Sequence, residues 1–170
     1  MDRSPNVVLT GFMGTGKTTV GRLLADLLGY EFVDTDELIV ELHGPVDEIF
    51  RDRGEDAFRA IERDVAAELA ERDRAVISTG GRMMLDPANA ATLGARARVF
   101  CLTASPETIA ARVLNGPARP LLAGDNPIAR VRQLLAEREA GYAPFEQVAT
   151  DNRTAAEIAD ELAARLAGMV

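Results

Sequence analysis

The chain has 170 residues, enough for one domain with a buried core, and its net charge of −8 argues against a nucleic-acid backbone or an anionic membrane surface as the main partner. No apolar run approaches the roughly 20 residues that a membrane span needs, and a single cysteine excludes an internal disulfide framework. That cysteine, Cys101, lies in an apolar run, which favours a buried structural thiol over a nucleophile. We expect a cytoplasmic protein that acts as a monomer.

The chain alternates between short apolar runs typical of buried strands and apolar stripes typical of amphipathic helices. The run Asn6–Thr10 ends at a glycine, and from Lys17 apolar residues recur at helical spacing as far as Gly29, a common C-cap residue type. Ser105 can cap a later helix that has Pro106 at its first position. In chain order the sequence predicts strands at 6–10, 31–33, 75–78, 99–102 and 148–150, and helices from 17 to 29, at 34–42, at about 55–72, after 105, through 128–135 and through 158–166.

This alternation predicts a parallel sheet covered by helices on both faces. In such sheets ligands bind beyond the carboxyl ends of the strands. The segment Asn115–Asn126 is rich in proline and glycine and predicts a surface loop. The residues that directly follow each strand are therefore the first candidates for a functional site.

The first strand leads into Gly11–Thr18, which matches the pattern G-x-x-x-x-G-K-[ST] in full. Glycines at these positions let backbone N–H groups surround phosphate oxygens, and the helix that follows adds its positive dipole end. In this pattern Lys17 reaches the β- and γ-phosphates and the Thr18 hydroxyl binds Mg²⁺. A chance glycine-rich turn is the alternative, but the strand before it and the helix after it favour a phosphate-binding loop, or P-loop.

The second strand ends at two carboxylates, Asp34 and Asp36. One of them can hold Mg²⁺ through water while the other accepts a hydrogen bond from a substrate hydroxyl. Alternatively, one simply caps the next helix, because Asp is a preferred N-cap residue.

The third strand runs into Ser78–Gly81, where paired glycines allow either a close ligand approach or a plain tight turn. Three arginines are further candidates, each with an ordinary structural alternative. Arg138 either falls on the inward side of its helix or caps a helix end. Arg59 is either a cation of the site or the partner of a glutamate three residues on. Arg119 either closes over ATP or only aids solubility. The residues alone do not decide between these alternatives.

Taken together, the motifs G-F-M-G-T-G-K-T, F-V-D-T-D, G-E-x-x-F-R-x-x-E, S-T-G-G and R-P-L-L occur in the order in which they occur in shikimate kinase, and the sequence resembles that family over nearly its whole length. The resemblance implies a three-layer α/β P-loop fold with a five-stranded parallel sheet, as one kinase domain over residues 1–170. It also implies a substrate-binding helical region at about 34–62 and an ATP lid at about 115–126. The implied reaction converts MgATP and shikimate into ADP and shikimate 3-phosphate, in aromatic amino-acid biosynthesis.

The resemblance also implies roles for individual residues. The implied catalytic residues are Lys17, Asp36 and Arg119. The implied ATP-binding residues are Gly14, Thr15, Gly16, Lys17, Thr18, Thr19, Arg112 and Arg119, with Thr18 and Asp34 at the Mg²⁺ ion. The implied acceptor-binding residues are Asp36, Arg59, Gly81 and Arg138, in which the two arginines hold the substrate carboxylate.

Two departures from the family pattern lie on the acceptor side. Arg82 stands where the family usually has a third glycine, and Glu139–Tyr142 replaces a common x-P-L-Y. Two alternatives therefore stay open: a related kinase for another hydroxy acid or sugar acid such as gluconate, and a nucleotide-binding module without turnover. Shikimate is the leading acceptor.

Overall fold

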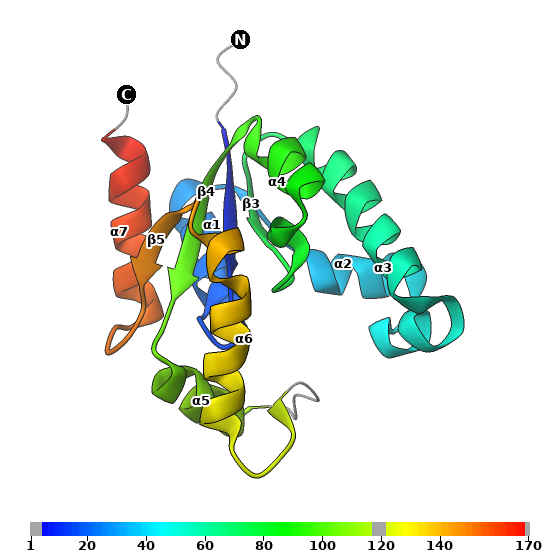
Figure 1. The fold of residues 1–170 in the computed structure, drawn as a ribbon. Coiled ribbons are helices and arrows are strands. Elements are labelled where there is room, and N and C mark those ends of the chain that lie inside the picture. Colours follow the sequence, from blue (N-terminus) through cyan, green and yellow to red (C-terminus); the bar gives the residue numbers. More distant parts are fainter. Residues whose placement is uncertain (1–4, 117–121, 169–170) are drawn as a thin grey trace.

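The structure, a computed structural model, describes residues 5–116 and 122–168. It contains one sheet of five parallel strands in the order β2-β3-β1-β4-β5 (Figure 1). The strands are β1 (Asn6–Gly11), β2 (Glu31–Asp34), β3 (Ala75–Ser78), β4 (Ala97–Thr103) and β5 (Glu146–Ala149). The helices are α1 (Lys17–Leu28), α2 (Thr35–His43), α3 (Val46–Ala70), the 3₁₀ turn η1 (Met83–Leu85), α4 (Pro87–Gly94), α5 (Pro106–Leu114), α6 (Pro127–Tyr142) and α7 (Ala155–Ala167).

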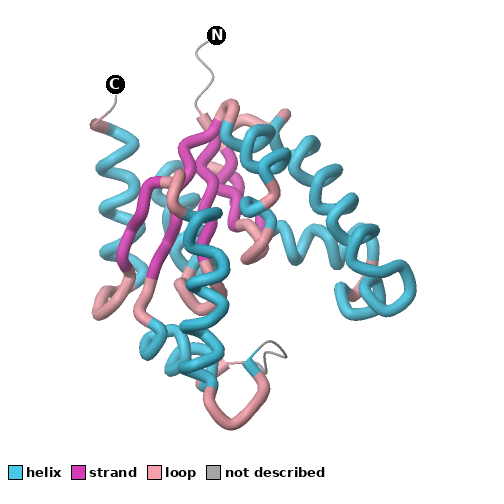
Figure 2. Tube along the Cα trace, viewed as in Figure 1, coloured by secondary structure: helices cyan, strands magenta, loops and turns pink. Residues whose placement is uncertain are grey.

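The central strand β1 divides the core between the two faces of the sheet, because successive side chains of a strand point to opposite sides. Val7 and Leu9 pack in one cluster with α1 and α7, and Val8 packs in the other with α3, η1 and α4. Figure 2 shows the resulting layers, with strands in the middle and helices on either side. The predicted fold, a parallel sheet covered on both faces, is confirmed.

Short polar side chains begin the helices that frame the sheet. The Ser105 hydroxyl accepts a hydrogen bond from the Thr108 backbone N–H, and Pro106 occupies the first position of α5 as predicted. A capping box at Thr154 and Glu157 begins α7. These caps satisfy backbone N–H groups that have no partner within the helix.

The structure corrects the sequence prediction in two places. Helix α3 begins at Val46 rather than near residue 55, and non-helical angles at Gly54 (φ 84°, ψ 172°) kink it. The sequence stretch Gly44-Pro45 ends α2 as expected, but a proline is also compatible with a helix start, so a new helix follows at once. The sequence does not predict turn η1 or helix α4. Helix α4 carries no clear apolar stripe, and its start is stabilised by Asp86, which caps it.

The carboxyl ends of the three strands β2, β3 and β1 lie side by side at one edge of the sheet. Asp34 at the end of β2 is in register with Ser78 at the end of β3, and Leu9 of β1 is in register with the same serine. The loops after these strands are therefore neighbours in space. Across the two described ranges, none of the helices is both long enough and apolar enough for a membrane span.

Candidate active site

A cavity of about 420 Å³ opens at this edge of the sheet, between the P-loop, α3 and α6. It brings together most of the residues that the sequence singled out. Those that line it are Gly14, Gly16, Lys17, Thr18, Thr19, Asp34, Asp36, Arg59, Gly81 and Arg138.

The P-loop positions its lysine at the base of this cavity. Gly14 and Gly16 have φ values of 75° and 95°, a left-handed conformation that glycine adopts at little cost. The Lys17 ammonium donates hydrogen bonds to the carbonyl oxygens of Gly11 and Phe12, at 2.8 and 3.0 Å. The loop's own backbone therefore orients this cation.

Asp34 links the P-loop helix to the next helix. One carboxylate oxygen accepts a hydrogen bond from the Thr18 hydroxyl at 2.9 Å. The other accepts from the backbone N–H groups of Asp36 and Glu37 and so caps α2. The capping alternative raised from the sequence is thus correct for Asp34, and the same side chain also presents an oxygen to Thr18 inside the cavity.

Asp36 lies directly against the backbone of the loop after β3. A Cβ placed on Gly80 would come within 2.7 Å of Asp36 Oδ1, so a side chain at residue 80 would push the carboxylate away. The Gly80 N–H donates to the buried Thr35 hydroxyl at 2.9 Å, which fixes the loop against the start of α2. The glycine at residue 80 therefore leaves the Asp36 carboxylate in its place, in addition to any role in a tight turn.

Arg59 enters the cavity from α3 between two glutamates. Its Nη1 donates to Glu62 at 2.7 Å and its Nη2 to Glu55 at 3.3 Å. Glu62 is almost fully buried, with 3% of its side chain exposed, and burial raises its pKa despite the opposing effect of Arg59. Burial lowers the pKa of Arg59, but the bonds to both carboxylates outweigh it and leave that pKa raised. The guanidinium is therefore charged and held from both sides.

Arg138 is buried, as its predicted inward position requires. Its guanidinium lies 5.1 Å from the centre of the Phe12 ring, a cation–π contact. Tyr142, one helical turn further along α6, donates from its hydroxyl to the Gly81 carbonyl. Burial raises the pKa of Tyr142, with Arg138 acting against that shift. Helix α6 therefore supplies both a cation to the cavity and a hydrogen bond to the loop after β3.

Two predicted site residues of the described part of the chain, Thr15 and Arg112, do not line this cavity. Thr15 is buried and its hydroxyl donates to the Phe12 carbonyl within the P-loop. Arg112 lies behind the loop, where it donates to the Gly14 carbonyl and to both oxygens of Thr150. Arg119 is outside the described residues. Arg82, the departure from the family pattern, lines the cavity with a side chain that is 55% exposed.

Sequence reasoning did not assign three residues that shape the cavity. Glu62 ends the motif G-E-x-x-F-R-x-x-E and is a possible partner of Arg59, and its spacing of three residues is the available signal. Thr35 lies between the two aspartates, where nothing in the sequence marks its buried hydroxyl. Tyr142 was noted only as part of an altered motif.

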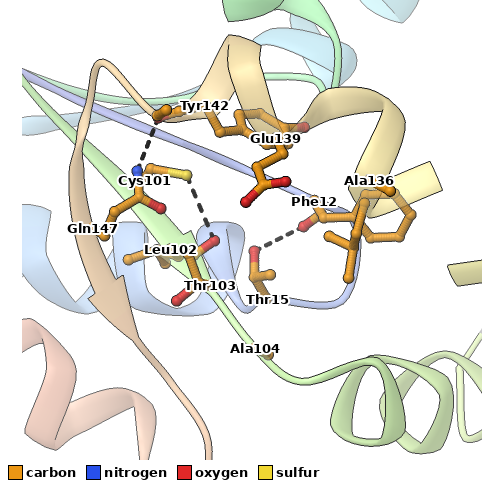
Figure 3. A pocket seen from close by; sticks show the side chains of 12 residues that line it. Phe12, Thr15, Cys101, Leu102, Thr103, Ala104, Ala136, Glu139, Tyr142 and Gln147 are labelled. Atoms are coloured by element: carbon orange, nitrogen blue, oxygen red, sulfur yellow. Dashed lines mark hydrogen bonds between the residues drawn. The ribbon is translucent and has the colours of Figure 1, made fainter. Parts of the chain in front are cut away.

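A second cavity of about 540 Å³ lies between β4, β5 and the end of α6 (Figure 3). Phe12 and Tyr142 form part of its wall and contact Arg138 and Gly81 of the first cavity. Cys101 faces it from β4; burial raises the pKa of this thiol to about 11, which fits a structural rather than a nucleophilic cysteine.

Comparison with known proteins agrees with this geometry. The family model described as shikimate kinase matches residues 13–167. A shikimate kinase from Geobacter metallireducens is 41% identical over 165 residues, which covers 96% of this chain and 92% of that protein. A shikimate kinase from Thermus thermophilus is 42% identical, with 94% and 89% covered.

Solved structures give the same result. Shikimate kinase from Acinetobacter baumannii, in complex with shikimate, superposes with a TM-score of 0.89 at 36% identity, covering 98% of this chain and 96% of that one. A gluconokinase from Sinorhizobium meliloti superposes with a TM-score of 0.66 at 22% identity, covering 98% and 94%. The second likeness shows a shared fold only. From the family match, the relatives and the geometry of the cavity, the chain belongs to the shikimate kinase family, whose members are phosphotransferases that act on an alcohol group.

Proposed function

We propose that the protein transfers the γ-phosphoryl group of ATP to shikimate, giving shikimate 3-phosphate and ADP. The observation that carries this proposal is the presence of two arginines, Arg59 and Arg138, in the same cavity as the P-loop lysine. Guanidinium groups bind carboxylates through paired hydrogen bonds, and shikimate is a carboxylate that carries hydroxyl groups. The complex of the Acinetobacter baumannii enzyme with shikimate supports this choice of acceptor.

At the nucleotide end, we assign phosphate binding to the backbone of Gly14–Thr19 and to Lys17. The positive end of α1 adds to this attraction. The Thr18 hydroxyl and the Asp34 carboxylate place two oxygen atoms 2.9 Å apart beside the lysine, a donor set that suits a hard cation. These two residues would hold Mg²⁺, directly or through water, and the ion would supply neutralisation of the phosphate charge.

At the acceptor end, Arg59, Arg138 and the Gly81 backbone orient the acid, and Asp36 faces its reacting hydroxyl. Asp36 then accepts or orients the hydroxyl proton while the oxygen attacks the γ-phosphorus in line. Most of the rate comes from positioning and charge stabilisation, so no covalent enzyme intermediate is needed.

Two further arginines complete the proposed ATP site. We assign Arg112 to the adenine side of the ATP site. Its hydrogen bonds to Gly14 and Thr150 support this assignment, because they place its guanidinium between the P-loop and the segment after β5. We assign Arg119 to an ATP lid over residues 115–126, where it would stabilise charge on the transferring group.

We also propose that residues 1–170 form one kinase domain, with residues 34–62 as the substrate-binding region. The enzyme would act as a cytoplasmic monomer. It would have no nucleic-acid or membrane partner, which the net charge of −8 supports. Size-exclusion chromatography with light scattering tests the oligomeric state.

The decisive experiment is ADP release from MgATP in the presence of shikimate, quinate, gluconate or no acceptor. Of these four conditions, we expect strong turnover only with shikimate as the acceptor. The variant Lys17→Ala should show no turnover, because it removes a cation from the phosphate site. Turnover with gluconate but not shikimate would move the assignment to the sugar-acid alternative. If ATP binds but no phosphoryl group is transferred to any of the acids, the alternative of a nucleotide-binding module without turnover would be supported.

A further inference from the structure

Arg82 and Arg59 both line the active-site cavity and share one carboxylate, that of Glu55. The Glu55 oxygen that accepts a hydrogen bond from Arg59 Nη2 at 3.3 Å lies 3.9 Å from Arg82 Nη1. Glu55 is therefore placed between a cation of α3 and a cation of the loop after β3.

The two carboxylates that hold Arg59 are not equally free to leave it. Glu62 has 3% of its side chain exposed and its bond is 2.7 Å long, so removing this partner would strand a buried charge. Glu55 has 56% of its side chain exposed and follows directly after the kink at Gly54, so it can rotate into solvent without disturbing the core. Glu55 is the partner that an incoming anion can displace.

A bound acidic acceptor and Glu55 would compete for the same guanidinium edge. Two carboxylates beside one Nη2 repel each other, and only one can keep a good hydrogen bond to it. Arg82, 55% exposed and already at 3.9 Å, offers Glu55 another cation with only a small movement of its side chain.

We propose that Arg82 is a positioning residue for acceptor binding, which takes Glu55 over from Arg59 when the acid enters and so leaves Arg59 free to hold the acceptor's carboxylate. This inference rests on the proposed function. It assigns Arg82 an effect on affinity and none on the phosphoryl-transfer step, because Arg82 acts through Glu55 and Arg59.

The test is a double-mutant cycle on residues 82 and 55, measured as the KM for shikimate and as its calorimetric Kd. We expect Arg82→Ala to raise both about threefold to fivefold with kcat unchanged, the range for partly exposed ion pairs. Adding Glu55→Gln should remove most of that increase, because the competing charge is gone. Arg82→Lys should stay close to wild type, since a point charge suffices at 3.9 Å.

A matched control is Arg63→Ala. Arg63 is another exposed arginine, on α3, and forms an ion pair with Asp86. This substitution should leave the KM for shikimate unchanged. An unchanged KM in Arg82→Ala would overturn the inference. So would an equal increase with and without Glu55→Gln, because it would indicate direct contact between Arg82 and the acceptor. Failure of the proposed function looks different: the wild-type enzyme itself would show no shikimate-dependent ADP release.

Discussion

Gly80 shows how closely the backbone approaches a functional side chain in this cavity. Its N–H is tied to Thr35, and the space where a Cβ would sit is filled by the Asp36 carboxylate. The sequence pattern Ser78–Gly81 is compatible with an ordinary turn, and only the fold shows that Asp36 comes from a different strand end to pack there. A side chain at residue 80 would therefore displace a carboxylate that is distant in sequence.

We predict that Gly80→Ala lowers kcat by up to about 100-fold, because the methyl group moves Asp36 away from the acceptor hydroxyl. The KM for ATP should stay near its wild-type value, since the P-loop is not touched. Steady-state kinetics with each substrate varied in turn checks this. A wild-type kcat would show that Asp36 tolerates displacement and would weaken its proposed role.

At the scale of elements, α1 packs closely against the sheet at Gly21. A Cβ on Gly21 would lie 2.6 Å from the Phe32 ring of β2 and 3.4 Å from Leu9 of β1. Phe32 is partly buried, packs against the core cluster on this face and lies under the Arg22 guanidinium, so a shift of its ring would disturb these contacts. The close contact between α1 and β2 therefore depends on this glycine.

We predict that Gly21→Ala lowers the free energy of unfolding by about 1–3 kcal/mol, measured by urea denaturation. The control is Gly94→Ala in α4, where the nearest atom to a new Cβ is 3.9 Å away. That substitution should be neutral or stabilise by up to about 1 kcal/mol, because alanine restricts the unfolded chain. Equal effects of the two changes would contradict the packing argument.

The start of α5 depends on a carboxylate from the segment after β5. Asp151 accepts hydrogen bonds from the Thr108 hydroxyl and the Ser105 N–H, and these bonds lower its pKa from 3.8 to about 2. Because the folded-state pKa is the lower one, the stabilisation is present above the unfolded value and is lost as the pH falls through about 2.

We therefore predict that Asp151→Asn lowers the Tm at neutral pH and that the difference from wild type shrinks between about pH 4 and pH 2. Thermal unfolding followed by circular dichroism across this range gives the comparison. Asp26→Asn, on an exposed position of α1, provides the control and should leave the Tm at neutral pH close to the wild-type value. A difference that stays constant with pH would mean that Asp151 stabilises through geometry rather than charge.

Elements with strong local signals could be predicted from the sequence, and those defined by distant contacts could not. Ser105 and Pro106 mark the start of α5 within the chain itself. Helix α4 has no comparable apolar stripe. The part of α3 before Gly54 was not predicted, because a glycine favours a helix end, although here the helix continues beyond it. In the cavity, the P-loop conformation follows from local sequence, whereas the Arg82–Glu55 approach depends on where β3 ends relative to α3.

At the scale of the whole molecule, the cavity draws on the P-loop, the loop after β3 and helices α2, α3 and α6. Any ligand that bridges these parts therefore stabilises the folded state as a unit. We predict that shikimate at about 100 times its Kd raises the free energy of unfolding by about 2.7 kcal/mol. Urea denaturation with and without shikimate measures the increase, and Arg138→Ala should lose most of it. No increase in the wild type would exclude binding to the native fold.

The sheet also separates the two ends of the folded unit from its chemistry. Strand β1 starts, and helix α7 finishes, on the side opposite the carboxyl ends of the strands (Figure 1). The cavity is lined by residues that follow those carboxyl ends. A fusion partner, an affinity handle or a tether to a sensor surface attached on that side would leave the substrate entrance open. Immobilised enzyme should thus keep the turnover that it has in free solution, which makes this fold convenient for flow assays and for single-molecule work.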